Sequence, residues 1–303
     1  MDVLPFLTTP GARLAGTLAA AGFGALWGSF LNVCIVRIPA GQSLVHPPSH
    51  CLACGQRVWA RDNIPILSYF LLRGRCRHCG AKFSGRYVLV ETLMAALSAL
   101  IFWSFVVGRP DEPLGLRAAR FAIYFAFAAV LIVLTFIDLA TKRLPDVITL
   151  PFMGVFFLSG FVLPDVVWWE RAIGAAAGYL LVRLVADGYY YLTGREGLGL
   201  GDGKLLAMIG ALLGWRAIPA VVFFSSAVGI LVTVPVLFLR RRLAPATVPA
   251  EAPPSSEQPA AERLVPLRLI EVPFGPFLAA SALAYLFLGD VAWNHLIRLT
   301  IGD

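Results

Sequence analysis

The feature that most constrains this chain is a series of apolar runs, each close to the length that crosses a bilayer. A helix needs about 20 apolar residues to span about 30 Å of hydrocarbon. Charged residues make up only 14% of the chain and hydrophobic residues 58%, whereas soluble domains carry about 25% charged residues. The sequence therefore predicts an all-α polytopic membrane protein with about eight transmembrane helices. The candidate runs are 14–37, 87–107, 119–138, 147–163, 171–192, 203–214, 217–239 and 270–297.

The arginine and lysine distribution predicts how these helices are oriented. With the N-terminus outside, the inner segments together with Arg37 hold 17 of the 25 Lys and Arg residues, and basic residues concentrate in cytoplasmic loops. We therefore expect a periplasmic N-terminus. The start lacks a cleavable signal pattern, so the first run is expected to remain as an anchor. No basic patch with interleaved aromatic residues indicates nucleic-acid binding. The inner segments are 38–86, 139–146, 193–204 and 240–269.

Three regions follow from this pattern. Residues 1–37 contain the first transmembrane helix, 38–86 form a small cytoplasmic loop domain, and 87–303 form the transmembrane core. Within the core, residues 243–266 are rich in Pro, Ala and Glu and poor in large apolar groups. Such a segment cannot build a core, so we expect a disordered cytoplasmic linker.

Four cysteines in the loop domain predict a zinc site. Cys51-x-x-Cys54 and Cys76-x-x-Cys79 are separated by 21 residues, and a glycine follows each pair. Two close thiolate pairs make a tetrahedral cage suited to structural zinc, and the glycines permit tight turns. Two disulfides or a redox pair are the alternatives, of which disulfides are disfavoured in a reducing cytoplasm. Cys34, within the first helix, is expected to be a packing residue.

Two aspartates predict the chemistry. Asp138 ends the third run in "LIVLTFIDLATKRLPDVITL", and Asp202 begins the sixth in "GLGLGDGKLLAMIGALLGW". Both then lie at the cytoplasmic edge of the membrane. Two carboxylates at short range share a proton, so that one can act as base on water while the other polarises a carbonyl. Gly199 and Gly201 free the backbone for close approach to a substrate, and Lys204 belongs to the same loop. The pattern is typical of an aspartic protease.

Simpler roles for these acids remain open at this point. Asp202 could be only a helix cap, and Asp138 could pair with Lys142 one turn later. Asp146, which follows Pro145, is the rival for the first catalytic carboxylate.

Other charges in apolar runs have separate explanations. Arg183 and Asp187 are four residues apart and are expected to form an ion pair. Glu91 is a candidate member of a functional network, because acids within the membrane are rare. Glu271 is expected at the interface.

Several motifs in order resemble the bacterial type IV prepilin peptidases. They are "GSFLNVCIVRIP" (28–39), the cysteine segment from "HPPSHCLACG" through "RCRHCGAKFSGRYVLVE" (46–91), the two aspartate motifs "IDLATKRLPDVITLP" and "GLGLGDGKLLAMIGALLGW", and "VPFGPFLA" (272–279). The resemblance implies catalytic roles for Asp138 and Asp202 and places the family's cysteines on the four named above.

The resemblance also implies a bifunctional enzyme of the bacterial inner membrane. Its substrates would be prepilins and pseudopilins, cut after a glycine on the cytoplasmic side and then N-methylated with S-adenosylmethionine. Two alternatives are a presenilin-like GxGD protease that cuts inside membrane helices, and an ion-coupled transporter with aspartates on its path. A transporter is expected to carry its acids near the bilayer midplane, whereas these lie at the edge.

Overall fold

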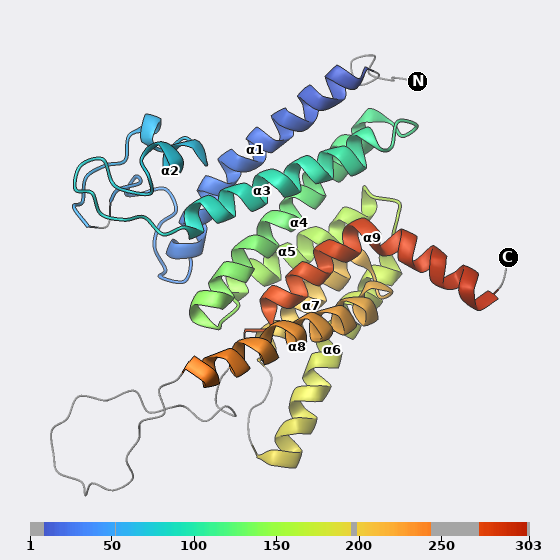
Figure 1. Ribbon diagram of the computed structural model, residues 1–303. Coiled ribbons are helices and arrows are strands. Elements are labelled where there is room, and N and C mark those ends of the chain that lie inside the picture. Colours follow the sequence, from blue (N-terminus) through green and yellow to red (C-terminus); the bar gives the residue numbers. More distant parts are fainter. Residues whose placement is uncertain (1–8, 52, 195–198, 244–272, 302–303) are drawn as a thin grey trace, which may run out of the picture.

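A computed structural model describes residues 9–51, 53–194, 199–243 and 273–301. The described chain is helical (Figure 1) and forms no strands, only two isolated β-bridges. The all-α prediction is confirmed. The expected linker, apart from Leu243 at the end of a helix, and Glu271 lie outside the described residues. The helices are α1 (Pro10–Arg37), α2 (Leu67–Leu71), α3 (Arg86–Phe102), α4 (Leu114–Thr141), α5 (Asp146–Leu158), α6 (Trp168–Thr193), α7 (Leu200–Leu213), α8 (Ala217–Leu243) and α9 (Gly275–Ile301).

Each of the eight apolar runs contains a helix, but the prediction of eight spans is not confirmed. Among the described residues, four helices are long and apolar enough to cross a membrane: α1, α3 with its π-turn to Val107, α4, and the first 20 residues of α8. The 14 residues of α7 extend only about 21 Å. α6 is long enough but contains four charged residues, Glu170, Arg171, Arg183 and Asp187.

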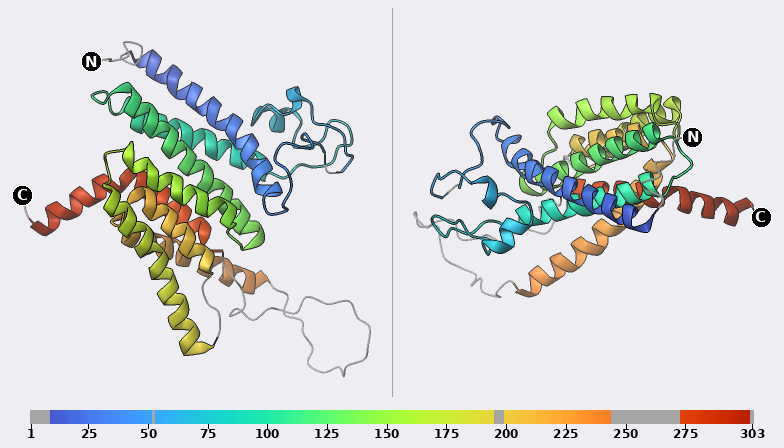
Figure 2. Two further views of the ribbon diagram at one scale, coloured as in Figure 1. Left: turned by 180° about the vertical axis from the view of Figure 1, so that it is seen from behind. Right: turned by 90° about the horizontal axis from the view of Figure 1, so that it is seen from above.

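The central helix of the bundle is α4. It lies between the α1–α3 pair and the helices that follow it in the chain (Figure 2), and it packs against α1, α3, α5 and α9. Its Phe127, Leu131 and Leu134 side chains are fully buried. Burying such a side chain stabilises a protein by about 1.5–3 kcal/mol when the unfolded chain exposes it to water. In a membrane the side chain leaves lipid instead of water, so the stabilisation comes from close packing.

Glycines bring α6 and α7 into close contact. A Cβ on Gly178 of α6 would lie 2.7 Å from the Leu206 carbonyl oxygen of α7. One turn further along, Gly174 and Gly210 face each other, and a Cβ on Gly174 would lie 2.6 Å from the Gly210 carbonyl oxygen. Small residues allow this approach because no side chain separates the backbones. A Cβ on Gly203, next to Asp202, would lie 3.3 Å from the Val182 Cβ of α6, so the start of α7 also lies against α6.

Buried arginines fasten the end of the bundle where α4 begins. Arg120, whose side chain is 2% exposed, bonds Glu112 at 2.8 Å and also contacts Asp165 from the α5–α6 connection. Arg171 donates to the Phe156 carbonyl and the Ser159 hydroxyl, each at 3.1 Å. The end of α5 and the beginnings of α4 and α6 are thus joined by ionic and hydrogen bonds.

Candidate active site and metal centre

The four cysteines of the expected zinc site come together in the loop between α1 and α3, residues 38–85, which we call the cysteine loop. The Sγ atoms of Cys51, Cys54, Cys76 and Cys79 all lie within 4.8 Å of one another, and the Cys51 and Cys79 sulfurs are 3.8 Å apart. A tetrahedral zinc site with Zn–S bonds of about 2.3 Å requires sulfurs about 3.8 Å apart. None of the four forms a disulfide in the structure, and their spacing favours the metal site over the disulfide alternative.

Two similar turns shape this cluster. In each pair the N–H of the first cysteine donates to the carbonyl five residues on, at 2.8 Å. The glycines that follow, Gly55 and Gly80, both have φ +71, a conformation that residues with a Cβ adopt at a steric penalty. The expected role of the glycines in tight turns is confirmed.

The local backbone also favours the thiolate form that binds metals. N–H groups of Cys54 and Ala53 lower the pKa of the Cys51 thiol to about 7. A thiolate, not a thiol, is the metal ligand. The cluster therefore has the donor atoms and the spacing to hold a metal ion.

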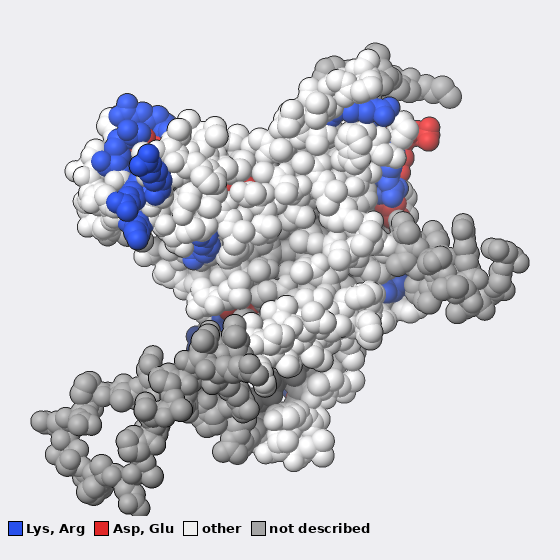
Figure 3. Space-filling view, in the orientation of Figure 1, with Lys and Arg blue, Asp and Glu red and all other residues white. Residues whose placement is uncertain are grey.

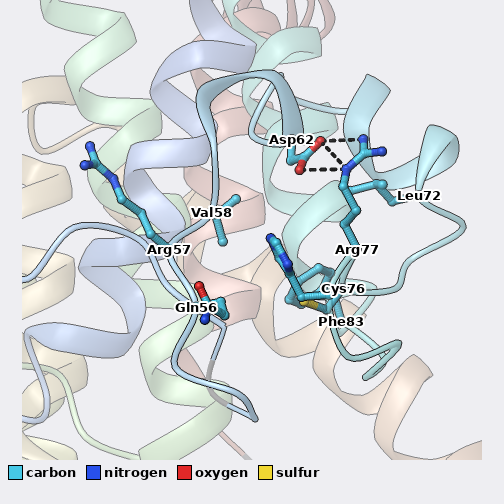
Figure 4. Close-up of a pocket in the computed structure, with 9 residues that line it drawn as sticks. Gln56, Arg57, Val58, Asp62, Leu72, Cys76, Arg77 and Phe83 are labelled. Carbon is cyan, nitrogen blue, oxygen red and sulfur yellow. Dashed lines mark hydrogen bonds and ion pairs between the residues drawn. The ribbon is translucent and has the colours of Figure 1, made fainter.

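An ion pair joins the two halves of the cysteine loop. Arg77 lies between the second pair of cysteines, and its guanidinium faces both oxygens of the Asp62 carboxylate at 2.6–3.1 Å (Figure 4). This hydrogen-bonded pair holds the pKa of Asp62 below its usual range. Bidentate geometry fixes orientation as well as distance, so the second pair is anchored to the segment that follows the first.

Asp138 lies in the last turn of α4 and is buried, with 5% of the residue exposed. Its Oδ2 accepts a hydrogen bond from the Gly275 N–H, at 3.0 Å, at the start of α9. The α4 helix ends three residues later, where Lys142 adopts a left-handed conformation (φ 54) and its N–H donates to the Asp138 carbonyl. The helix end and α9 together fix this carboxylate in the interior.

Asp202 lies in the first turn of α7 and is half-buried. The N-cap of α7 is Gly199, not Asp202, so Asp202 does not have the simple capping role that was left open. Its carboxylate is close enough to Asp138 for the two charges to interact. Within the described residues, no hydrogen bond reaches the Asp202 carboxylate. The structure therefore brings together two acids from distant parts of the chain, one held and one available.

The other predicted loop residues surround Asp202. Lys204 binds Asp146 through both carboxylate oxygens, at 2.6 and 2.7 Å, and thereby joins α7 to the start of α5. Asp146, the rival acid, is thus partnered by a lysine. A Cβ on Gly201 would lie 3.1 Å from the Leu144 side chain, whereas Gly199 faces open space.

Charged side chains of α3 and α6 also form specific contacts. Arg183 and Asp187 form the predicted pair, at 2.8 Å, on an exposed face of α6. Glu91 accepts a hydrogen bond from the Ile66 N–H, at 2.7 Å, and so joins α3 to the cysteine loop. The sequence reasoning missed Gly275 as a partner of Asp138, although it recorded the "VPFGPFLA" motif that contains it.

Comparison with known proteins identifies the family. Residues 23–105 match the bacterial peptidase A24 N-terminal domain, and residues 125–234 match the type IV leader peptidase family. The chain is 37% identical to a prepilin leader peptidase/N-methyltransferase of Aeromonas hydrophila, over 88% of this chain and 89% of that protein. The chain belongs to the type IV leader peptidase family.

Two other relatives are also named prepilin leader peptidase/N-methyltransferase. The protein of Dickeya chrysanthemi is 36% identical over 97% of this chain and its own full length. That of Neisseria gonorrhoeae is 38% identical over 71% of this chain and 80% of its own. No solved structure matches the chain. The matches support the leader peptidase reading and not the presenilin-like alternative.

Proposed function

We propose that this chain removes the leader of prepilins and pseudopilins after a glycine and then N-methylates the new N-terminal residue. The observations that support the proposal are that the Asp138 carboxylate is held by the start of α9, that Asp202 lies within range of its charge, and that the chain belongs to the leader peptidase family. An aspartic mechanism needs two such acids around one water molecule.

The proposed chemistry divides the work between the acids. Asp138 accepts the water proton, because an ionised carboxylate is an acceptor only and Asp138 already accepts the Gly275 N–H. Asp202 carries the shared proton and polarises the scissile carbonyl. Hydroxide adds to the carbonyl carbon, the C–N bond breaks, and the proton passes to the leaving amine.

We also propose that the cysteine cluster holds zinc as a structural ion. Four thiolates close the coordination sphere, so the metal has no open position for substrate. Its role is to fold the cysteine loop, and the peptidase step does not pass through it. S-adenosylmethionine is the proposed methyl donor, implied by the methyltransferase names of the relatives.

The proposed location is the bacterial inner membrane, with the N-terminus periplasmic. The cysteine loop and the two aspartates then face the cytoplasm, where basic loops concentrate. Four candidate spans support insertion in the lipid bilayer. The division into 1–37, 38–86 and 87–303 belongs to the same proposal.

The test is cleavage and methylation of a purified prepilin with a labelled methyl donor, each read separately. Asp138→Asn and Asp202→Asn are expected to abolish leader removal, since neither amide can exchange the required proton. Asp187→Asn is the matched control, because Asp187 pairs with Arg183 on an exposed face and its loss should leave cleavage unchanged. Cleavage at the parent rate by folded Asp138→Asn protein would reject Asp138 as the base and favour Asp146.

A further inference from the structure

The short helix α2 in the cysteine loop presents an apolar face to the outside. Leu67, Phe70 and Leu71 are 60%, 67% and 76% exposed. Spacings of three and four residues put them on one side of the helix. Adjacent large apolar side chains left uncovered indicate a binding surface, whereas isolated ones do not.

The position of α2 along the bundle indicates what covers this face. The N–H of Ile66, which precedes α2, donates to Glu91 in α3. Glu91 in turn packs against α1, because a Cβ on Gly28 would lie 2.6 Å from the Glu91 Cα. α1 continues from Gly28 to Arg37, about 14 Å further. The beginning of α2 is therefore level with the interior of two candidate spans and not beyond their ends.

Figure 1 agrees with this placement, since α2 lies on the side of the cysteine loop next to α1. Other segments of the loop extend past the ends of α1 and α3. An apolar face at this level, outside the bundle, meets lipid if α1 and α3 cross the bilayer.

The charge of the cysteine loop fits a lipid surface of opposite sign. The loop contains six Lys and Arg residues and one acid, Asp62, which binds Arg77. Arg73 and Arg75, directly after α2, are exposed, and Figure 3 shows blue side chains gathered on this loop. A basic residue near an anionic leaflet contributes about 1 kcal/mol, and apolar residues beside arginines are typical of interfacial helices.

We propose that α2 lies in the headgroup region of the bilayer, with its apolar face toward the acyl chains and the neighbouring arginines on anionic lipid headgroups. The cysteine loop would then be held at two places, by the hydrogen bond to Glu91 of α3 and by α2 in the membrane. This inference rests on the membrane placement of α1 and α3 that belongs to the proposed function.

Photo-crosslinking of the full-length protein in nanodiscs tests the proposal. The photoreactive residue p-benzoylphenylalanine replaces Leu71 in one variant and Val45 in another. Val45 is a matched control, 73% exposed, in a segment that Arg37 holds at the end of α1 through the Ser43 and Pro47 carbonyls. A third variant carries the probe at Leu100 of α3, which is 44% exposed. Lipid adducts are measured by mass spectrometry.

We expect adducts at Leu71 and Leu100 and several-fold fewer at Val45. Adducts at Leu100, with Leu71 no higher than Val45, would overturn the inference and leave the membrane placement intact. No adducts at Leu100 would reject the placement itself. With prepilin added, crosslinks from Leu71 to prepilin in place of lipid would assign the face to substrate and overturn the proposal.

The charge contribution has its own readout. The adduct yield at Leu71 is expected to rise when phosphatidylglycerol is added to phosphatidylcholine nanodiscs. Arg73→Glu should reduce that rise while the yield at Leu100 stays constant. A yield at Leu71 that is independent of phosphatidylglycerol would contradict the assignment of the arginines to anionic headgroups.

Discussion

Asp138 is held by a main-chain N–H, which makes Gly275 sensitive to any added side chain. A Cβ on Gly275 would lie 2.6 Å from the Asp138 Oδ2, which is closer than non-bonded atoms approach each other. We expect Gly275→Ala to displace this carboxylate and lower the kcat of leader cleavage about 10- to 100-fold. A hydrogen bond to a charged group is worth about 1.5–3 kcal/mol. KM should change little, and prepilin cleavage kinetics give both constants.

Gly229→Ala provides the comparison for Gly275→Ala. Its Cβ would lie 3.5 Å from the Phe277 ring, an ordinary contact, in the helix that packs beside α9. Its kcat should match that of the parent protein. Equal kcat values for the two variants would show that the Gly275 position does not orient Asp138.

At the scale of residues, the sequence predicted sites whose geometry is local. The cysteine pairs were recognisable because each pair closes its own turn, and the two turns need only be brought together. The hydrogen bond from Gly275 to Asp138 joins residues 137 positions apart, so no spacing rule reveals it. On sequence alone Asp146 rivals Asp138 as the base, and its contact with Lys204, 58 positions away, depends on the packing of α5 against α7.

At the scale of helices, the close contact between α6 and α7 predicts a strong position effect. Gly178→Ala would force a methyl group to within 2.7 Å of a main-chain oxygen of Leu206, whereas Gly188→Ala, in the same helix, meets nothing within 4 Å. Overpacking that moves backbone costs about 1–3 kcal/mol. Thermal unfolding in detergent should therefore show a lower Tm for Gly178→Ala.

Gly188→Ala should keep or raise the Tm, because alanine favours helix by about 1 kcal/mol over glycine. A Gly178→Ala protein as stable as the Gly188→Ala protein would mean that α6 and α7 separate easily.

The helices themselves were predictable, but their relation to the membrane was only partly so. Apolar runs form helices because a backbone in a low-dielectric setting must satisfy its own hydrogen bonds. Whether a helix crosses the membrane also depends on its length and on the charges it carries. Here α7 is too short, and α6 contains Glu170 and Arg171 in its first turn. Arg171 is buried by hydrogen bonds to the end of α5, a tertiary contact that hydropathy does not register.

At the scale of the whole molecule, the cysteine loop should depend on its metal for structure. The parent protein is expected to contain one zinc ion per chain. The Cys76→Ser protein should contain much less, because removing any one of the four thiolates weakens zinc binding. Without zinc, residues 38–85 should become susceptible to limited proteolysis while α1 and α3 remain protected. Elemental analysis and mapping of the cleavage sites provide the two measurements.

Cys34→Ser is the matched cysteine variant. Cys34 is buried within α1 and lies outside the sulfur cluster, so zinc content and protease resistance should stay at parent values. Equal zinc content in Cys76→Ser and Cys34→Ser proteins would rule out the cluster as the metal site.

The buried ion pairs of Arg120 hold one end of α4 more firmly than the other. Arg120 and Asp138 lie on one helix, 18 residues or about 27 Å apart. Glu112 and Asp165 bind the Arg120 end, whereas the Asp138 end is joined to α9 by the Gly275 hydrogen bond. The two ends of α4 are therefore held differently, by a cluster of buried ion pairs at Arg120 and by a single hydrogen bond at Asp138, so a peptide that needs the helices to separate is expected to enter at the Asp138 end.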